Sequence, residues 1–315
     1  MSVNYQWIED QLKASYLNEE LVQDLWSGYG KLKRIFLDNG ESIILKEINF
    51  PINQKHPRGW STSLSDERKR RSYQVEQCWY EGLAMRLNQK TKIPRFLGKH
   101  EDGEISFLLE DLNTSGFPIR NHDLNMEGVK SVLRWLARFH ATFLGVEPKG
   151  LWPIGTYWHL DTRPDEFEAM ETSWLKENAH KIDELLKTAK YQTIVHGDAK
   201  LANFCFSEQM DVAAVDFQYV GGGCGMKDVA YFMSSCLSSE DAFRFESELL
   251  DAYFEELKQY ISPDIYPELV LEWRELYTLA WADFLRFLKG WAPDHYKFNN
   301  YSFIQLERAK DILTF

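Results

Sequence analysis

The residue pattern changes near residue 114, and this change limits the folds that the chain can adopt. Before it, segments 31–36 and 42–50 alternate apolar and polar residues, and 105–109 is an apolar run, which is typical of β-strands. Asp38-Asn39-Gly40 separates the first two segments and favours a hairpin turn, because these residue types accept positive φ. After residue 114 most of the chain has helical periodicity. A small strand-rich lobe followed by a larger helical lobe is therefore predicted.

Helical periodicity predicts the main elements of the second lobe. The expected helices are 126–144, 165–188, 240–260 and 266–290, and short strands are expected around 192–196, 202–206 and 211–217. We divide the chain into an N-terminal lobe of residues 1–113 and a C-terminal lobe of residues 114–315.

The first lobe also contains helical patterns. A short helix within residues 5–27 is expected to end at a turn over 27–30, and 51–65 reads as a loop because it is rich in Pro, Gly and Ser. Residues 66–88 form a second expected helix, with one face that carries Tyr73, Glu76, Tyr80, Leu83 and Leu87.

Charge is distributed unevenly along the 315 residues. Residues 1–113 hold 16 basic and 17 acidic side chains, while 114–315 hold 20 and 31, so the second part carries nearly all of the net charge of −12. A negative field disfavours nucleic acid or an anionic membrane as a partner. For the same reason we expect a small-molecule partner that is neutral or cationic.

The four cysteines and the first residues predict a compartment. Cys78, Cys205, Cys224 and Cys236 form no CxxC pair and no metal-ligand spacing, which suits reduced thiols. Residues 1–10 are polar and acidic, unlike a signal peptide, and no apolar run approaches the ~20 residues that span a bilayer. We expect a cytoplasmic protein without a membrane partner.

Asp198 begins the pattern that carries the chemistry. In Val195-His196-Gly197-Asp198-Ala199-Lys200-Leu201-Ala202-Asn203, a Lys follows Asp198 by two residues and an Asn by five, and Val215-Asp216-Phe217-Gln218 comes later. A carboxylate such as Asp198 can orient a hydroxyl nucleophile and accept its proton, and Lys200 can neutralise charge on a transferring phosphoryl group. Asn203 and Asp216 offer the hard oxygen ligands that Mg²⁺ prefers. Taken singly, each could be an ordinary loop or surface residue; together they favour phosphoryl transfer.

Lys46 and Glu76 form a second candidate pair. Lys46 stands late in the apolar strand Ile43-Ile44-Leu45-Lys46, and Glu76 is the one carboxylate on the Tyr73–Leu87 stripe. A buried charge without a partner is costly, so we expect these two side chains to pair beside the phosphates of a nucleotide. Glu81 is the competing partner, but its helical neighbours are less apolar.

With these motifs the chain resembles the kinase-like small-molecule phosphotransferases, the superfamily of aminoglycoside phosphotransferases and choline kinases. It is most similar to the ecdysteroid-kinase-like branch. The matching motifs, in order, are Leu108–Leu112, Leu136–Ala141, His196-Gly197-Asp198 with Asn203, Val215–Gln218 and Asp228–Phe232.

The resemblance implies a two-lobed protein-kinase-like α+β fold with ATP between the lobes. It implies Glu110 to Leu112 as the hinge whose backbone meets adenine, Asp198 as the catalytic residue, and Asn203 and Asp216 as magnesium ligands. It also implies that Asp228 braces the catalytic loop, and His140 reads as a packed helix residue.

Two departures from the protein-kinase pattern concern the acceptor. Gly197 stands where protein kinases carry an Arg, and the interval from Asp216 to Asp228 is short, which argues against a protein substrate.

Two glycine-containing segments could lie near the phosphates. Residues 27–31 match a glycine-rich loop poorly, and they are the candidate cover of the phosphates. Gly221-Gly222-Gly223 is expected to be a flexible loop rather than a phosphate-binding nest.

The last predicted helices are rich in aromatic residues, but these residues do not identify the acceptor. They could frame a quaternary ammonium or a sterol-like alcohol, but their spacing favours helix core for most of them: Trp273, Tyr277, Trp281, Phe284, Phe287, Trp291 and Tyr296. The sequence thus predicts an ATP- and Mg²⁺-dependent kinase of a small-molecule hydroxyl, such as a choline-, aminoglycoside- or sterol-like alcohol. The alternatives are a catalytically silent nucleotide-binding protein and a kinase of macromolecules.

Overall fold

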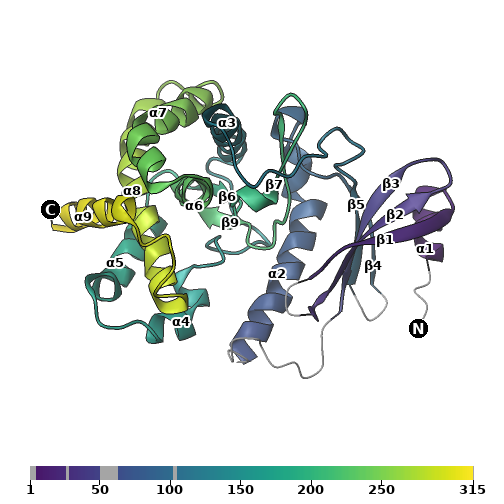
Figure 1. The fold of residues 1–315 in the computed structure, drawn as a ribbon, viewed down its shortest axis with the longest axis horizontal. Helices are drawn as coiled ribbons and strands as arrows, with labels where there is room; N and C mark the ends of the chain where they lie inside the picture. The colour runs from purple at the N-terminus through teal and green to yellow at the C-terminus, as the bar shows by residue number, and fades with distance from the viewer. Residues whose placement is uncertain (1–4, 26–27, 50–62, 102–104, 315) are drawn as a thin grey trace.

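A five-stranded antiparallel sheet and a mainly helical region make up the fold (Figure 1). The computed structural model describes residues 5–25, 28–49, 63–101 and 105–314. The sheet lies at one end of the molecule and the later helices at the other, and the long helix α2 (Ser63–Glu81) runs between them (Figure 1). The predicted α+β class and two-lobed order are confirmed, whereas the boundary at residue 113 stays a prediction.

The sheet has the strand order β1-β2-β3-β5-β4. Its strands are β1 (Tyr16–Asp24), β2 (Gly30–Leu37), β3 (Ser42–Ile48), β4 (Phe96–Glu101) and β5 (Ile105–Glu110). The predicted hairpin is confirmed as β2–β3, with Lys33 opposite Leu45 and Phe36 opposite Ser42. Pairing of β3 with β5 puts Lys46 opposite Phe107 in the middle of the sheet.

The prediction for residues 5–27 is wrong in its second half. Helix α1 covers only Gln6–Leu12, and the following residues form the edge strand β1. Nearly every β1 side chain is exposed, so the alternation that reveals a half-buried strand is missing. Strand β4, the other edge, was also not predicted, and a register shift between Phe96 and Gly98 interrupts its pattern.

Helix α2 begins earlier and ends earlier than its pattern predicts. It starts at Ser63, within the expected loop 51–65, of which residues 51–62 lie outside the described residues, and a short 3₁₀ helix, Leu83–Arg86, follows it. Trp79 of α2 is fully buried, stacks on Phe217 at a centroid distance of 5.0 Å and meets Phe143 edge-on. Truncation of such a residue to Ala lowers the free energy of unfolding by about 3–5 kcal/mol, so Trp79 contributes strongly to the packing of α2 against the helical lobe.

The helical lobe contains seven α-helices among the described residues. They are α3 (Met126–Thr142), α4 (Pro164–Glu168), α5 (Trp174–Lys187), α6 (Met226–Cys236), α7 (Ser239–Lys258), α8 (Tyr266–Trp291) and α9 (Asn300–Thr314). The single helix predicted at 165–188 is two helices, because Ser173 starts α5 afresh by accepting a hydrogen bond from the amide of Lys176. Helix α6 was missed because it is buried on nearly every side and lacks a polar face.

Two small antiparallel ribbons carry the loops of the helical lobe. Strand β6 (Thr193–Val195) pairs with β9 (Gly221–Gly223), and β7 (Phe204–Phe206) pairs with β8 (Val212–Ala214). The three glycines are therefore a buried strand, and the expectation of a flexible loop is wrong. A Cβ at Gly221 would lie 2.3 Å from the carbonyl oxygen of Trp152, so close packing of two backbones requires glycine. Among the described helices, none is long and apolar enough to cross a membrane.

Candidate active site

Two adjoining cavities lie where the sheet, α2 and the helical lobe meet. We name them after the ligands expected from the sequence, the nucleotide-side cavity, of about 400 Å³, and the acceptor-side cavity, of about 440 Å³. The first is lined by Lys46, Glu76, Leu112, Asn203 and other residues from β1–β3 and β5, and the second by Asp198, Lys200 and parts of α2 and α8. Both are lined by Gln23, Leu25, Asp216 and Gln218, so a molecule in one cavity would meet a molecule in the other at Asp216.

The loop that begins at His196 is held rigidly by a carboxylate of α6. Asp228 accepts hydrogen bonds from the backbone amides of His196, at 2.5 Å, and Gly197, at 2.9 Å. His140 lies 3.1 Å from the same carboxylate and 2.8 Å from the hydroxyl of Tyr253. The bracing position expected for Asp228 and the packed position expected for His140 are confirmed.

Gly197 is required by its backbone conformation. Its φ is +80°, and a Cβ there would lie 2.0 Å from the carbonyl oxygen of Tyr219. No other residue type fits this turn without a shift of the 219 segment. The chain therefore turns sharply after β6 and presents Asp198 to the acceptor-side cavity.

The side chain of Asp198 is held by two donors and keeps one oxygen free of partners among the described residues. Lys200 Nζ and Asn203 Nδ2 each lie 2.9 Å from Oδ2, and Asn203 Nδ2 also donates to the Asp198 carbonyl at 2.7 Å. Oδ1 is buried without a hydrogen-bond partner in the described chain. Burial raises the pKa of Asp198, and the charge of Lys200 offsets this only in part.

Asp216 lies at the junction of the two cavities in a strained backbone conformation. Its φ of +68° is uncommon for a residue other than glycine, and its Oδ1 is also buried without a described partner. Burial alone would raise the pKa of Asp216, but Lys46, Lys200 and Lys69 together hold it below its usual value. The carboxylate therefore stays ionised and ready for a cation.

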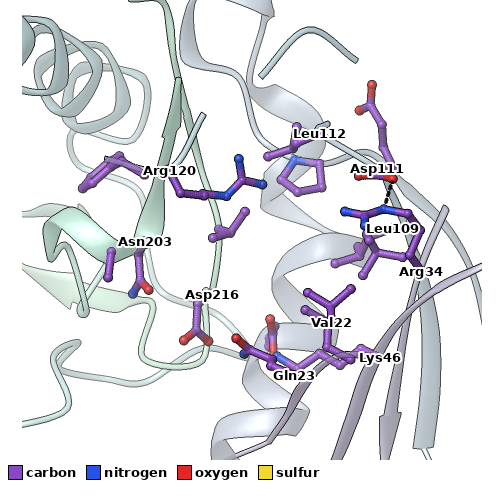
Figure 2. Close-up of a pocket in the computed structure, with 18 of the residues that line it drawn as sticks. Val22, Gln23, Arg34, Lys46, Leu109, Asp111, Leu112, Arg120, Asn203 and Asp216 are labelled. Atoms are coloured by element: carbon purple, nitrogen blue, oxygen red, sulfur yellow. Dashed lines mark hydrogen bonds and ion pairs between the residues drawn. The ribbon is translucent and has the colours of Figure 1, made fainter. Parts of the chain in front are cut away.

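Asn203 and Asp216 form a donor set that fits a magnesium ion shared with phosphates. Because Asn203 Nδ2 is committed to Asp198, its amide oxygen is available, and Figure 2 shows Asn203 and Asp216 on the same side of the nucleotide-side cavity. No group of three or more His, Cys, Asp or Glu in the described chain could hold a metal by itself. Two protein oxygens, with phosphate and water oxygens completing the shell, are what Mg²⁺ accepts.

Lys46 and Glu76 form the predicted ion pair. Lys46 Nζ lies 2.5 Å from Glu76 Oε2, and both side chains are buried. Burial raises the pKa of Glu76, and the charge of Lys46 counteracts it. Glu81, the competing partner, instead pairs with Lys99 at 3.0 Å near the surface. Figure 2 shows Lys46 across the cavity from Asn203.

In the expected hinge, Glu110 to Leu112, the groups available to a ligand belong to the backbone rather than to the side chain of Glu110. Both oxygens of Glu110 accept from Lys92 Nζ, and Oε2 also accepts from the Arg95 amide, so its side chain is not available to a ligand. Leu112 lines the cavity, and its amide makes no backbone hydrogen bond within the described chain. Asp111 accepts hydrogen bonds from Arg34, at 2.6 Å, and Ser42, at 2.7 Å, which fixes the hinge to the sheet (Figure 2).

Several lining residues were not predicted from the sequence. Gln218 Oε1 accepts a hydrogen bond from Lys69 Nζ at 2.7 Å. The Val215–Gln218 motif contains Gln218 but does not predict this contact. Val22, Gln23 and Leu25 of the missed first strand and the turn after it line the nucleotide-side cavity. Of the segment expected to cover phosphates, Ser27 lies outside the described residues.

The aromatic residues of the last helices divide between core and cavity. The side chains of Trp273, Tyr277, Trp281 and Phe284 are buried, as their spacing favours. Phe287 and Trp291 line the acceptor-side cavity, whereas Tyr296 is 74% exposed.

The fold matches solved structures of kinases at low sequence identity. An ethanolamine kinase from Plasmodium vivax has a TM-score of 0.53 and 11% identity over 96% of this chain and 86% of its own. An amicoumacin kinase solved with AMP-PNP and Ca²⁺ has a TM-score of 0.50 and 14% identity over 98% and 93%. At such identities the likeness shows the fold alone. No curated protein matches the sequence.

The sequence also matches the model of one protein family, which is more specific than a shared fold. The model described as the ecdysteroid kinase-like family matches residues 75–148 and 156–263, which include Asp198, Asn203 and Asp216. Since this match covers more than half of the chain, the protein belongs to the ecdysteroid kinase-like family.

Proposed function

We propose that the protein is an ATP- and Mg²⁺-dependent kinase that phosphorylates a hydroxyl group of a small molecule. The observation that carries the proposal is a pair of buried carboxylate oxygens, Asp198 Oδ1 and Asp216 Oδ1, that have no hydrogen-bond partner among the described residues. Buried polar atoms are nearly always satisfied. Asp198 lines the acceptor-side cavity and Asp216 lines both cavities, so their unpartnered oxygens favour ligands in both.

Each residue has a distinct role in the proposed reaction. Asp198 orients the acceptor hydroxyl and takes up its proton as the new oxygen–phosphorus bond forms and the bond to the β-phosphate oxygen breaks, releasing ADP. Lys200 and Lys46 supply positive charge on either side of the transferring group. Asn203 and Asp216 would hold Mg²⁺, which neutralises phosphate charge when bound. The amide of Leu112 would donate to adenine.

The family and the two solved kinases support this assignment. The amicoumacin kinase was solved with a nucleotide analogue and a divalent cation, and the Plasmodium protein is an ethanolamine kinase, an enzyme of a small alcohol. Gly197 and the short interval from Asp216 to Asp228 argue against a protein acceptor. The cytoplasmic location stays a prediction from the sequence.

The test is an ATP-consumption assay against choline, ethanolamine, aminoglycosides, sugars and steroids. Asp198→Asn should lower turnover of any accepted alcohol by about 10²–10⁴-fold while Mg·ATP binding persists, since Asp198 acts on the acceptor side. Normal turnover by this variant would show that another residue orients the acceptor. Failure of ATP with Mg²⁺ to shift the melting temperature of the native protein would refute nucleotide binding and with it the proposal.

A further inference from the structure

We infer that the acceptor is an anionic alcohol, whose carboxylate, sulfonate or phosphate group binds Arg68 while its hydroxyl faces Asp198. This inference rests on the proposed function, because it names the substrate class of the same site. It is drawn from the charged side chains that line the acceptor-side cavity: Arg68, Lys69, Arg163, Lys200, Glu166, Asp198 and Asp216.

The three carboxylates of the lining are already committed. Asp198 pairs with Lys200, and Asp216 lies where the metal and phosphates would meet. Glu166 accepts from Arg163 at 3.0 Å through Oε1. None of these carboxylates forms an ion pair with Arg68 or Lys69, although the charge of Glu166 acts on Arg68.

Lys69 belongs to the phosphoryl end of the cavity. Its Nζ donates to Gln218 Oε1 and lies 4.7 Å from the ring centre of Tyr73, and Asp216 and Lys46 are among the charges that act on it. A cation at this position faces the transferred phosphoryl group rather than the body of the acceptor.

Arg68 lies near Arg163 and Glu166 and has no ion-pair partner among the described residues. Its guanidinium donates to the Thr162 carbonyl at 2.7 Å and the Ser65 hydroxyl at 3.3 Å. Residues 50–62, which precede α2 in sequence, contain no Asp or Glu. Burial and the nearby charge of Arg163 lower the pKa of Arg68, and the acidic neighbours do not restore it. An oxyanion there would remove this imbalance, since guanidinium groups bind oxyanions through charge-assisted hydrogen bonds.

Glu166 adds a hydrogen-bond acceptor at the same end. Its Oε2 is buried and has no donor among the described residues. A hydroxyl or ammonium group next to the oxyanion of the acceptor would satisfy it, so a polyfunctional hydroxy acid fits better than a simple one.

Aromatic side chains make up much of the remaining lining of the acceptor-side cavity. Tyr157, Tyr219, Phe287 and Trp291 line it, and the rings of Phe287 and Trp291 stack at a centroid distance of 5.8 Å. The acceptor is therefore expected to have a flat or apolar body. The inference replaces the neutral or cationic acceptor expected from the charge of residues 114–315, because the basic Arg68 and Lys69 come from α2, outside that segment.

The experiment measures binding without turnover. The full chain is titrated by calorimetry with para-(hydroxymethyl)benzoate, its methyl ester, the corresponding sulfonate, the phosphate ester of the matching phenol, and the corresponding benzylamine. We expect the anions to bind about 10- to 100-fold more tightly than the ester, and Arg68→Met to remove this difference. Arg71→Met is the matched control: it lies one turn further along α2, contacts the carbonyls of Gly150 and Leu151, and lines neither cavity.

Four outcomes would overturn the inference: equal binding of acid and ester, tighter binding of the amine, an anion preference that survives Arg68→Met, or loss of AMP-PNP binding rather than acid binding in that variant. Arg68→Lys should keep part of the preference, and circular dichroism checks that each variant is folded. If the acid binds through Arg68 but no alcohol consumes ATP, the proposed function fails while the charge preference stands.

Discussion

The two cavities differ in how their charges are compensated. On the nucleotide side three cations have a near carboxylate partner, in the pairs Lys46–Glu76, Arg34–Asp111 and Lys92–Glu110. The exposed Arg120, which also lines that cavity, donates instead to the carbonyls of Phe117 and Ile119 and to Asn113 Oδ1. On the acceptor side Arg68 and Lys69 have no ion-pair partner among the described residues, and burial lowers the pKa of each. The main ion pairs of the nucleotide side thus form without ligand, whereas two buried or half-buried cations of the acceptor side lack a carboxylate partner in the described chain.

Removal of one partner of a complete pair should have the largest effect on stability. Lys46→Met leaves Glu76 buried and unpaired and should lower the free energy of unfolding by about 3–5 kcal/mol, as measured by urea denaturation. Lys99→Met, which breaks the exposed pair with Glu81, is the control and should cost no more than about 1 kcal/mol. If both variants lost the same free energy of unfolding, the stability of the protein would not depend on the Lys46–Glu76 ion pair in particular.

Lys200 should control the pH dependence of the acceptor side. In the proposed reaction Asp198 acts as the carboxylate, so activity should fall as the pH drops through its pKa, which burial raises above the usual value for Asp. Lys200 opposes that rise; Lys200→Met should therefore move the acid limb of the kcat/KM profile to higher pH and lower the plateau by about 10- to 100-fold. If the acid limb of the kcat/KM profile did not move in this variant, the Lys200–Asp198 ion pair would not control the ionisation of the catalytic group.

The smallest effect is expected at the aromatic wall. Trp291→Leu should raise the KM for the acceptor by up to about tenfold and leave the KM for ATP unchanged, because the ring stacks on Phe287 only on the acceptor side. Tyr296→Leu, at an exposed neighbouring ring, is the control. A change in the KM for ATP alone would contradict the division of the cleft into two sides.

The same contrast explains what the sequence predicted. Asp198, Lys200, Asn203 and Asp216 lie close along the chain, so their spacing predicts the positions that the structure brings together. Lys46 and Glu76 were found because a charge in an apolar pattern requires a partner.

The acceptor side was not predicted because its wall is assembled from distant segments. Arg68 comes from α2, Arg163 from the residue before α4 and Trp291 from the end of α8, and no local pattern connects them. In the fold, the edge strand β1 and the helix α6 were not predicted for a related reason. Nearly all side chains of β1 are exposed and nearly all of α6 are buried, and periodicity requires a contrast between faces.

Helix α2 forms a wall of both cavities, and this has a thermodynamic consequence. Glu76 pairs with Lys46, and both Arg68 and Lys69 line the acceptor-side cavity. The ring centre of Tyr73 lies 5.4 Å from Lys46 Nζ and 4.7 Å from Lys69 Nζ. A shift of this helix on binding at one site would change the other site, so the two substrates are expected to influence each other's affinity. By linkage, the factor by which ATP tightens the acceptor must equal the factor by which the acceptor tightens ATP.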